Sequence, residues 1–174
     1  QVLEVLCCAC SCVVMAYTGL LLAGSAIPFW STWTLVVLFF FSALSSGVST
    51  VLLLDYFTQG QTLLLRSVKP LQRAHVACLL LEAAALALFL GAAFSNPQAQ
   101  PSVALLLEPD MLANGAVGVL GMGLAVPLVL ETTSLARKES RSIPVSDVVC
   151  LIGGFLLRYC IVACGAHWAG PVFL

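Results

Sequence analysis

Charge is scarce in this sequence of 174 residues: only 9% of them are Asp, Glu, Lys or Arg, and the net charge is −1. A soluble domain carries about 25% charged residues, so this composition excludes an ordinary water-exposed surface. The sequence also lacks a basic face interleaved with aromatic residues, which excludes the common modes of nucleic-acid binding. What remains is 61% hydrophobic with a mean hydropathy of +1.08, and it predicts an integral membrane protein.

Motifs that build a self-contained active site are lacking too. No phosphate-binding loop, no zinc signature of the H-E-x-x-H kind and no serine–histidine–carboxylate set with usable spacing occurs. The eight cysteines lie in apolar runs, where cysteine is usually a small packing residue. The cluster CCACSC at residues 7–12 invites a metal interpretation, but metal sites usually combine separated pairs or histidines at set spacing. Packing is therefore favoured, and we predict no catalytic residue and no metal site.

Five apolar runs are long enough to cross a membrane, which takes about 20 residues. Because lipid offers the backbone no hydrogen-bond partners, each run must be helical. We predict an all-α, polytopic membrane helix bundle in a single domain, residues 1–174. The first residue is Gln1, and the apolar sequence that follows has no basic segment before it and no small-residue cleavage site, so we predict that it is not a signal peptide. Because a helix starts at residue 2, we expect earlier sequence upstream. The predicted helices cover about 2–26, 33–54, 74–94, 111–130 and 145–168.

Positive charge is distributed unevenly between the predicted loops. Six of the seven Lys and Arg residues lie in loops 56–73 and 132–144, and none lies in loops 27–32 and 95–110. Because loops rich in Lys and Arg stay in the cytoplasm, we predict that this sequence begins inside and ends outside. Tryptophans are enriched at membrane interfaces. Those that then fall at the outer interface are Trp30, Trp33 and Trp168.

Two ionisable residues fall inside the predicted helices, where charge is costly and usually functional or paired. Glu82 lies about 12 Å from the cytoplasmic end of its helix, and Arg158 lies about 18 Å from the same side. Three interpretations stay open. The two residues form a structural ion pair, they line a proton path or polar cavity, or Glu82 is neutral and only hydrogen-bonded.

The two histidines lie at opposite ends of their helices, about 30 Å apart across the membrane. His75 and His167 therefore cannot share a haem within this sequence, and we expect no haem here. Each is interpreted as an interfacial residue, although His167 could also serve a quinone or an outer partner. Tyr17, in the outward half of the first helix, needs a hydrogen-bond partner for its phenol. That partner is either a backbone group of another helix or a quinone carbonyl near the outer face.

Small residues follow one another along the fourth helix and in the middle of the fifth. Such residues let two helices approach closely, and this interpretation is favoured over close approach of a flat ligand. The glycines concerned are Gly115, Gly118, Gly121, Gly123, Gly153 and Gly154.

The hairpin over residues 17–47 carries a family resemblance. Its sequence, YTGLLLAGSAIPFWSTWTLVVLFFFSALSSG, resembles the NrfD / polysulfide reductase (PsrC-like) membrane-subunit family. In that family a YTG-like element precedes a Pro-x-Trp corner and a helix ending in a SALSSG-like element. The segment GGFLLRYCIVACG at residues 153–165 resembles the last helix of the family, and GLAVPLVLE and Glu82 fit in order. The resemblance covers most of the sequence.

The resemblance implies an eight-helix subunit, of which this sequence would be the C-terminal five-helix portion. It implies a multi-pass anchor of a respiratory oxidoreductase complex in a bacterial or archaeal cytoplasmic membrane. Such anchors hold no haem and exchange electrons between menaquinone or ubiquinone and a ferredoxin-like iron–sulfur subunit, which often serves a molybdopterin catalytic subunit. The upstream helices would supply much of the quinone pocket.

Carried onto this sequence, the resemblance and the chemistry above mark a small set of positions. Tyr17, Trp30 and His167 are the candidates for quinone binding, and Glu82 and Arg158 are the intramembrane polar positions. The protein is then either a non-catalytic or a quinone-reactive subunit, with possible proton movement. Two alternatives stay open: an ion- or proton-translocating transporter subunit, and a purely structural membrane anchor.

Overall fold

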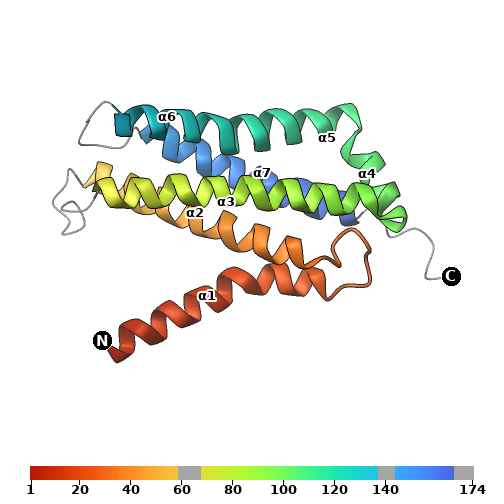
Figure 1. Ribbon diagram of the computed structural model, residues 1–174, viewed down its shortest axis with the longest axis horizontal. Coiled ribbons are helices and arrows are strands. Elements are labelled where there is room, and N and C mark those ends of the chain that lie inside the picture. The colour runs from red at the N-terminus through yellow and green to blue at the C-terminus, as the bar shows by residue number, and fades with distance from the viewer. Residues whose placement is uncertain (59–67, 137–143, 167–174) are drawn as a thin grey trace.

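The computed structural model describes residues 1–58, 68–136 and 144–166 of the protein (Figure 1). In these residues the backbone forms helices joined by short turns, and five helical segments are long and apolar enough to span a membrane. The predicted all-α membrane bundle is confirmed. The elements are α1 (Val2–Ala23), α2 (Trp33–Phe57), α3 (Val68–Ser95), η2 (Pro97–Ala99), α4 (Gln100–Leu106), α5 (Pro109–Ala113), η3 (Asn114–Ala125), α6 (Val126–Ala136) and α7 (Pro144–Ala166).

Three helix ends extend past charged residues at which the prediction stopped. The second helix continues past Asp55 to residue 57, the third begins at residue 68 rather than 74, and the fourth continues past Glu131 to residue 136. The expectation that Glu131 closes its helix is wrong. A hydropathy criterion ends a helix at the first charged residue. The helix itself can continue and either turn that residue inward, as at Glu131, or leave it exposed at the end of the bundle, as at Lys69 and Arg73. The fourth span is also built differently from a plain α-helix. Its middle part, η3, has the wider hydrogen-bonding pattern of a π-helix.

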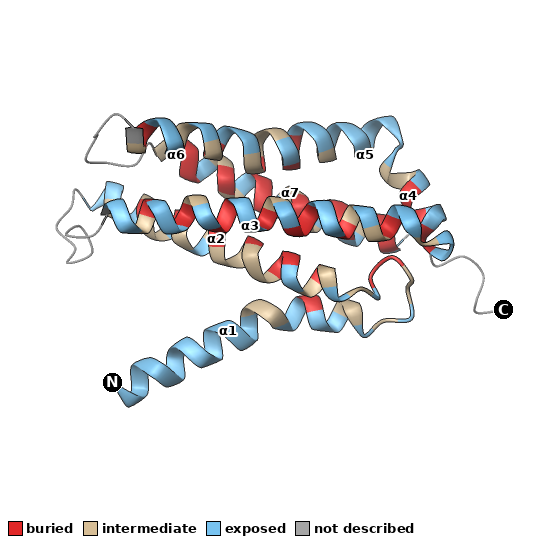
Figure 2. Cartoon of the chain, viewed as in Figure 1, coloured by how far each residue is buried: buried red, intermediate tan, exposed pale blue. Residues whose placement is uncertain are grey.

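Helix α1 is the least buried part of the protein. It packs on α2 through its second half, where Gly19 lies so close that a methyl group added to it would be 2.8 Å from Val36 Cα. Its first half leaves the bundle and is exposed along its length (Figure 2). The cysteines within residues 7–12 are all exposed there. Within the described residues, the structure therefore does not support the interpretation of these four cysteines as packing residues.

The other helices form the bundle proper, in which α7 contacts both α2 and η3 (Figure 1). The predicted close approach of small residues is confirmed at Gly123 and Gly153, whose backbones touch. It is confirmed again at Gly118, where an added methyl group would be 2.5 Å from Leu156 Cδ1. It is not found at Gly115, beside which there is open space.

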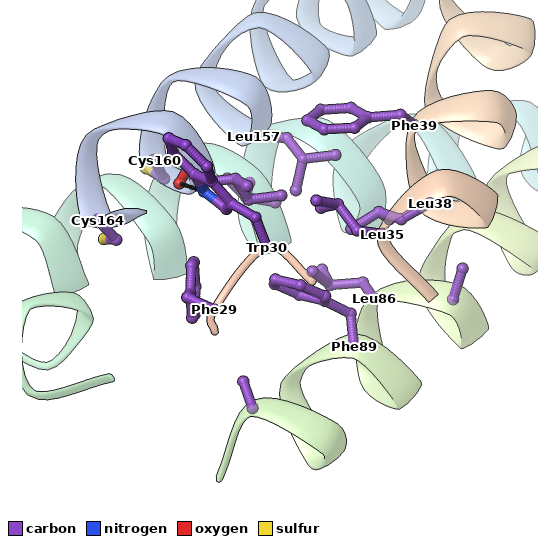
Figure 3. Close-up of a cluster of buried hydrophobic side chains, with 14 of the residues drawn as sticks. Phe29, Trp30, Leu35, Leu38, Phe39, Leu86, Phe89, Leu157, Cys160 and Cys164 are labelled. Carbon is purple, nitrogen blue, oxygen red and sulfur yellow. Dashed lines mark hydrogen bonds between the residues drawn. The ribbon is translucent and has the colours of Figure 1, made fainter. Parts of the chain in front are cut away.

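The aromatic turn between α1 and α2 packs into the bundle at the end where α4 lies. Trp30 is buried, and its Nε1–H donates to the carbonyl oxygen of Ile161 at 3.0 Å (Figure 3). Its ring occupies the space that a side chain at Gly165 would need. Phe29 meets Phe89 of α3 edge-on, with ring centroids 5.3 Å apart. We call this end of the bundle the corner end.

The opposite end is where α2 and α6 finish and where α3 and α7 start (Figure 1). We call it the loop end. Lys69 and Arg73, which the charge bias assigned to the cytoplasmic side, lie here on the exposed side of α3. At the corner end Trp33 is 78% exposed, as expected of an interfacial ring.

Candidate functional site

A row of serines on α2 organises the polar interior. Ser42, Ser45 and Ser49 follow one another at spacings of three and four, so they share one face of the helix. All three are buried between α2 and its neighbours. The element SALSSG, which carried part of the family resemblance, therefore presents hydroxyl groups to the core rather than only small packing surfaces.

The first polar cluster lies midway along the bundle, around Glu82 on α3. Ser45 Oγ donates to Glu82 Oε2 at 2.6 Å, a short bond typical of a charge-assisted or carboxyl hydrogen bond. Arg158 on α7 donates from Nη1 to the carbonyl oxygen of Gly154 at 3.1 Å. A methyl group on Gly154 would be 2.8 Å from Ser46 Oγ and 3.6 Å from Arg158 Nη1, so this glycine makes room for both.

Glu82 and Arg158 are neighbours that do not touch. They lie near enough to interact electrostatically, but no nitrogen–oxygen distance of 4.0 Å or less joins them in the structure. The direct ion pair that the sequence left open is therefore not formed. Glu82 accepts a hydrogen bond from Ser45 instead, and Arg158 donates one to the carbonyl oxygen of Gly154.

The second polar cluster lies at the loop end and joins three helices. His75 of α3, Glu131 of α6 and Asp147 of α7 are at most 1% exposed, and their ligand atoms all lie within 4.8 Å of one another. His75 Nδ1 is 3.4 Å from Glu131 Oε1. On its other side, Nε2 lies 3.0 Å from Ser49 Oγ and 3.7 Å from Cys150 Sγ.

The interpretation of His75 as an interfacial residue is wrong, since its side chain is completely buried. The burial of His75 could have been predicted from the helical spacing of the polar residues on α3. Gln72, His75 and Glu82 recur at intervals of three and seven on one face of α3, and all are buried. Sequence reasoning missed Glu131 and Asp147 as its neighbours because each lies near a helix end, where a charged residue is expected to meet water.

Several polar atoms of the loop-end cluster have no hydrogen-bond partner within the described residues. Native proteins leave few buried polar atoms unpaired, so a group of such atoms indicates a place where water or an ion binds. Both carboxylate oxygens of Glu131 are among them, and so is His75 Nδ1. The others around this end are Gln72 Nε2, Ser134 Oγ and Ser146 Oγ.

A cavity of about 180 Å³ opens at the corner end between α3, α4, η3 and α7. Its walls are apolar and partly aromatic, and they include Phe29, Phe89, Gly115, Val119 and Ile161. An apolar cavity of about 150 Å³ in another protein stays dry and binds benzene, so this one has room for a single aromatic ring. Because Trp30 pins the turn to α7, Phe29 is held in the cavity wall.

Of the candidates for quinone binding, the structure describes Tyr17 and Trp30. Tyr17 is 56% exposed on α1, and its hydroxyl has no hydrogen-bond partner in the part of the protein that the structure describes. Trp30 is buried, and its indole N–H already donates to the carbonyl oxygen of Ile161. His167 lies outside the described residues, as does Trp168.

Comparison with known proteins yields one family and one curated relative. The family model described as "Polysulphide reductase, NrfD" matches residues 1–169. A polysulfide reductase subunit of Wolinella succinogenes, its C subunit, is 30% identical over 162 residues, which make up 90% of this sequence and 51% of that protein. The protein described here thus spans about half the length of the curated relative that it matches. No solved structure matches it.

Proposed function

The chain belongs to the NrfD family of polysulphide reductase membrane subunits, and from this premise we propose that it forms part of a quinone-interacting membrane anchor. In this role the protein exchanges electrons between the quinone pool and an iron–sulfur partner subunit. The observation that carries the proposal is the family match over nearly the whole sequence. The corner-end cavity supports it, because a benzoquinone ring is flat, apolar except for its two carbonyls, and of about the size that such a cavity holds.

The residues of this protein would bind and shield the ring rather than react with it. Phe29 and Phe89 offer aromatic walls, and the apolar lining excludes water. Trp30 acts indirectly, since its bond to Ile161 holds the turn that carries Phe29. The electron chemistry belongs to the quinone and to the clusters of the partner.

A polar group must still orient the quinone carbonyls, and the cavity wall supplies none of its own. We keep Tyr17 as one candidate donor because its hydroxyl is unengaged in the described residues. We further propose that the other wall of the pocket belongs to a part of the protein that precedes this sequence, as the eight-helix resemblance implies.

Filling the cavity tests the proposal. Gly115 lines it and has open space beside it, so Gly115→Leu should enter the cavity without displacing backbone. We expect turnover with a short-chain quinol analogue to fall at least about tenfold, which is about 1.4 kcal/mol. Gly91→Leu is the matched control, because Gly91 also has open space but does not line the cavity. Equal activity of the two variants would exclude the cavity as the ring site.

The partner subunits give an independent test of the class. The complex purified from membranes should contain iron–sulfur clusters and should react with menaquinol or ubiquinol analogues. A preparation without an iron–sulfur partner, whose activity does not depend on quinone, would contradict the proposal.

Proton movement is a second candidate function, and the polar interior favours it. Glu82 accepts a hydrogen bond from Ser45, on the same helix face as Ser42 and Ser49, so hydroxyl groups continue in both directions. In proteoliposomes, Glu82→Gln should abolish quinone-linked proton translocation while quinol oxidation continues. Glu4→Gln, on the exposed half of α1, is the control. If Glu82→Gln and Arg158→Gln alter assembly but neither turnover nor translocation, the purely structural anchor is the better description.

A further inference from the structure

The loop-end cluster buries two carboxylates, Glu131 and Asp147, beside a single histidine. Glu131 is 1% exposed, and neither of its carboxylate oxygens has a hydrogen-bond partner among the described residues. Those residues also offer it no lysine or arginine. Burying a carboxylate without a compensating charge is very costly, so Glu131 needs a proton of its own, a protonated His75 beside it, or a metal cation.

The spacing of the cluster distinguishes these solutions. The 3.4 Å between His75 Nδ1 and Glu131 Oε1 exceeds the 2.7–3.2 Å of an ordinary N–H···O hydrogen bond. Two ligand atoms on a tetrahedral zinc ion, each about 2.0–2.2 Å from it, lie roughly 3.3–3.6 Å apart. The observed separation fits two neighbouring ligands of one ion. An oxygen of Asp147 lies within 4.8 Å of both atoms, so a small side-chain movement completes a third ligand.

The hydrogen bond on the far side of the imidazole fits the same interpretation. Ser49 Oγ lies 3.0 Å from Nε2, and we assign the ring proton to this nitrogen, with Ser49 as acceptor. Nδ1 then directs its lone pair toward Glu131. Histidines that bind a metal usually donate their other ring N–H in this way, which fixes the tautomer. Cys150 lies on the Nε2 side, at 3.7 Å, and so is not part of this ligand set.

We propose that His75, Glu131 and Asp147 bind one divalent transition-metal ion, for which Zn²⁺ is the probe. One imidazole nitrogen and two carboxylate oxygens suit such an ion. Two carboxylates balance its charge, so the site is neutral overall, as a buried site within a membrane protein requires. The three ligands come from α3, α6 and α7. The ion therefore ties three helices together at the loop end, and this role does not depend on the proposed quinone reaction.

Metal analysis of the purified complex tests the proposal. The background carries Ser in place of Cys7, Cys8, Cys10 and Cys12, because these exposed thiols could bind zinc by themselves. After incubation with Zn²⁺ and removal of excess, we expect about one zinc per protein molecule. Glu131→Gln, which keeps the side-chain shape, should reduce retained zinc to below about a tenth. Glu82→Gln is the matched control, since it alters a buried carboxylate outside the cluster and should retain the ion.

The ligand atoms provide a second measurement that requires no variant. X-ray absorption at the zinc edge should show only nitrogen and oxygen neighbours at about 2.0–2.2 Å. Sulfur neighbours at about 2.3 Å would overturn the proposal in favour of a cysteine site. No retained zinc in the parent protein, or equal zinc in Glu131→Gln, would overturn it as well and would point to a proton shared between His75 and Glu131.

Discussion

The corner end and the loop end belong to the same apolar helices, yet they bury different chemistry. At the corner end the aromatic turn, α3 and α7 enclose apolar side chains and a cavity, and the Trp30 N–H finds the carbonyl of Ile161. Among the described residues, every buried carboxylate and histidine lies instead midway or at the loop end. These residues are Glu82, His75, Glu131 and Asp147.

This difference shows how a membrane bundle divides its tasks. One end is held by shape, through a large ring fitted over a glycine, and it keeps a cavity free for an apolar molecule. The other end is held by polar groups from four helices, and its stability depends on the proton or cation that neutralises their charge. Substitutions at the corner end should therefore act through packing, and those at the loop end through charge and bound ions.

The largest effect is expected where Trp30 lies over Gly165. Gly165→Val places a side chain in the space that the indole occupies, which should displace the ring and break its bond to Ile161. Overpacking and a lost buried hydrogen bond together should cost roughly 2–5 kcal/mol. The measurement is thermal unfolding in detergent, with Gly91→Val as the control because open space surrounds Gly91. Equal stability of the two variants would show that the corner end is not held by shape.

Chelation should have the next largest effect and should act on the loop end alone. Removing a metal present at 100 times its dissociation constant lowers the free energy of unfolding by about 2.7 kcal/mol. We expect this loss in the parent protein and in Trp30→Phe, and no loss in Glu131→Gln. Thermal unfolding with and without chelator provides the measurement. A loss of the same size in Glu131→Gln would remove the distinction between the two ends.

Removing only the Trp30 N–H should have a smaller effect. Trp30→Phe keeps an aromatic ring packed against α7 but loses the bond to the Ile161 carbonyl, which should cost about 0.5–1.5 kcal/mol. Trp33→Phe is the matched control, because Trp33 is exposed and should change stability by less than about 0.5 kcal/mol. If both variants behave alike, the buried hydrogen bond contributes nothing to the corner end.

The smallest effect on stability is expected for Tyr17→Phe. The phenol of Tyr17 has no partner in the described residues, so its removal should change stability by less than about 0.5 kcal/mol. If Tyr17 donates to a quinone carbonyl, the KM for a quinol analogue should rise nevertheless. Steady-state kinetics beside thermal unfolding separate the two effects, and a marked loss of stability would assign the phenol to an interhelical bond instead.

Much of the architecture could be predicted from residue order. The five spans and their helical nature follow from run length, and the family follows from the hairpin over residues 17–47. Glu82 and Arg158 could be identified because charge inside an apolar run is conspicuous. The direct contact between them could not be decided, since it depends on how α3 and α7 are rotated about their axes.

The loop-end cluster lay beyond sequence reasoning for a related reason. His75, Glu131 and Asp147 come from three helices, and each lies near a helix end, where hydropathy expects contact with water. Only the packing of α3, α6 and α7 turns all three inward. The corner-end cavity was equally hidden, because its walls are ordinary apolar residues whose spacing carries no signal.

The sequence by itself determined that this protein is a bundle of membrane helices. Its apolar runs have the length of membrane-spanning helices, and in lipid each run must pair its backbone N–H and C=O groups internally. The tertiary structure decided which helix faces meet. That choice depends on contacts such as Gly123 with Gly153 and Trp30 with Gly165, in which the volume of one residue matters only opposite a particular partner. The same contacts bring a histidine and two carboxylates to one point at the loop end and leave a cavity at the corner end.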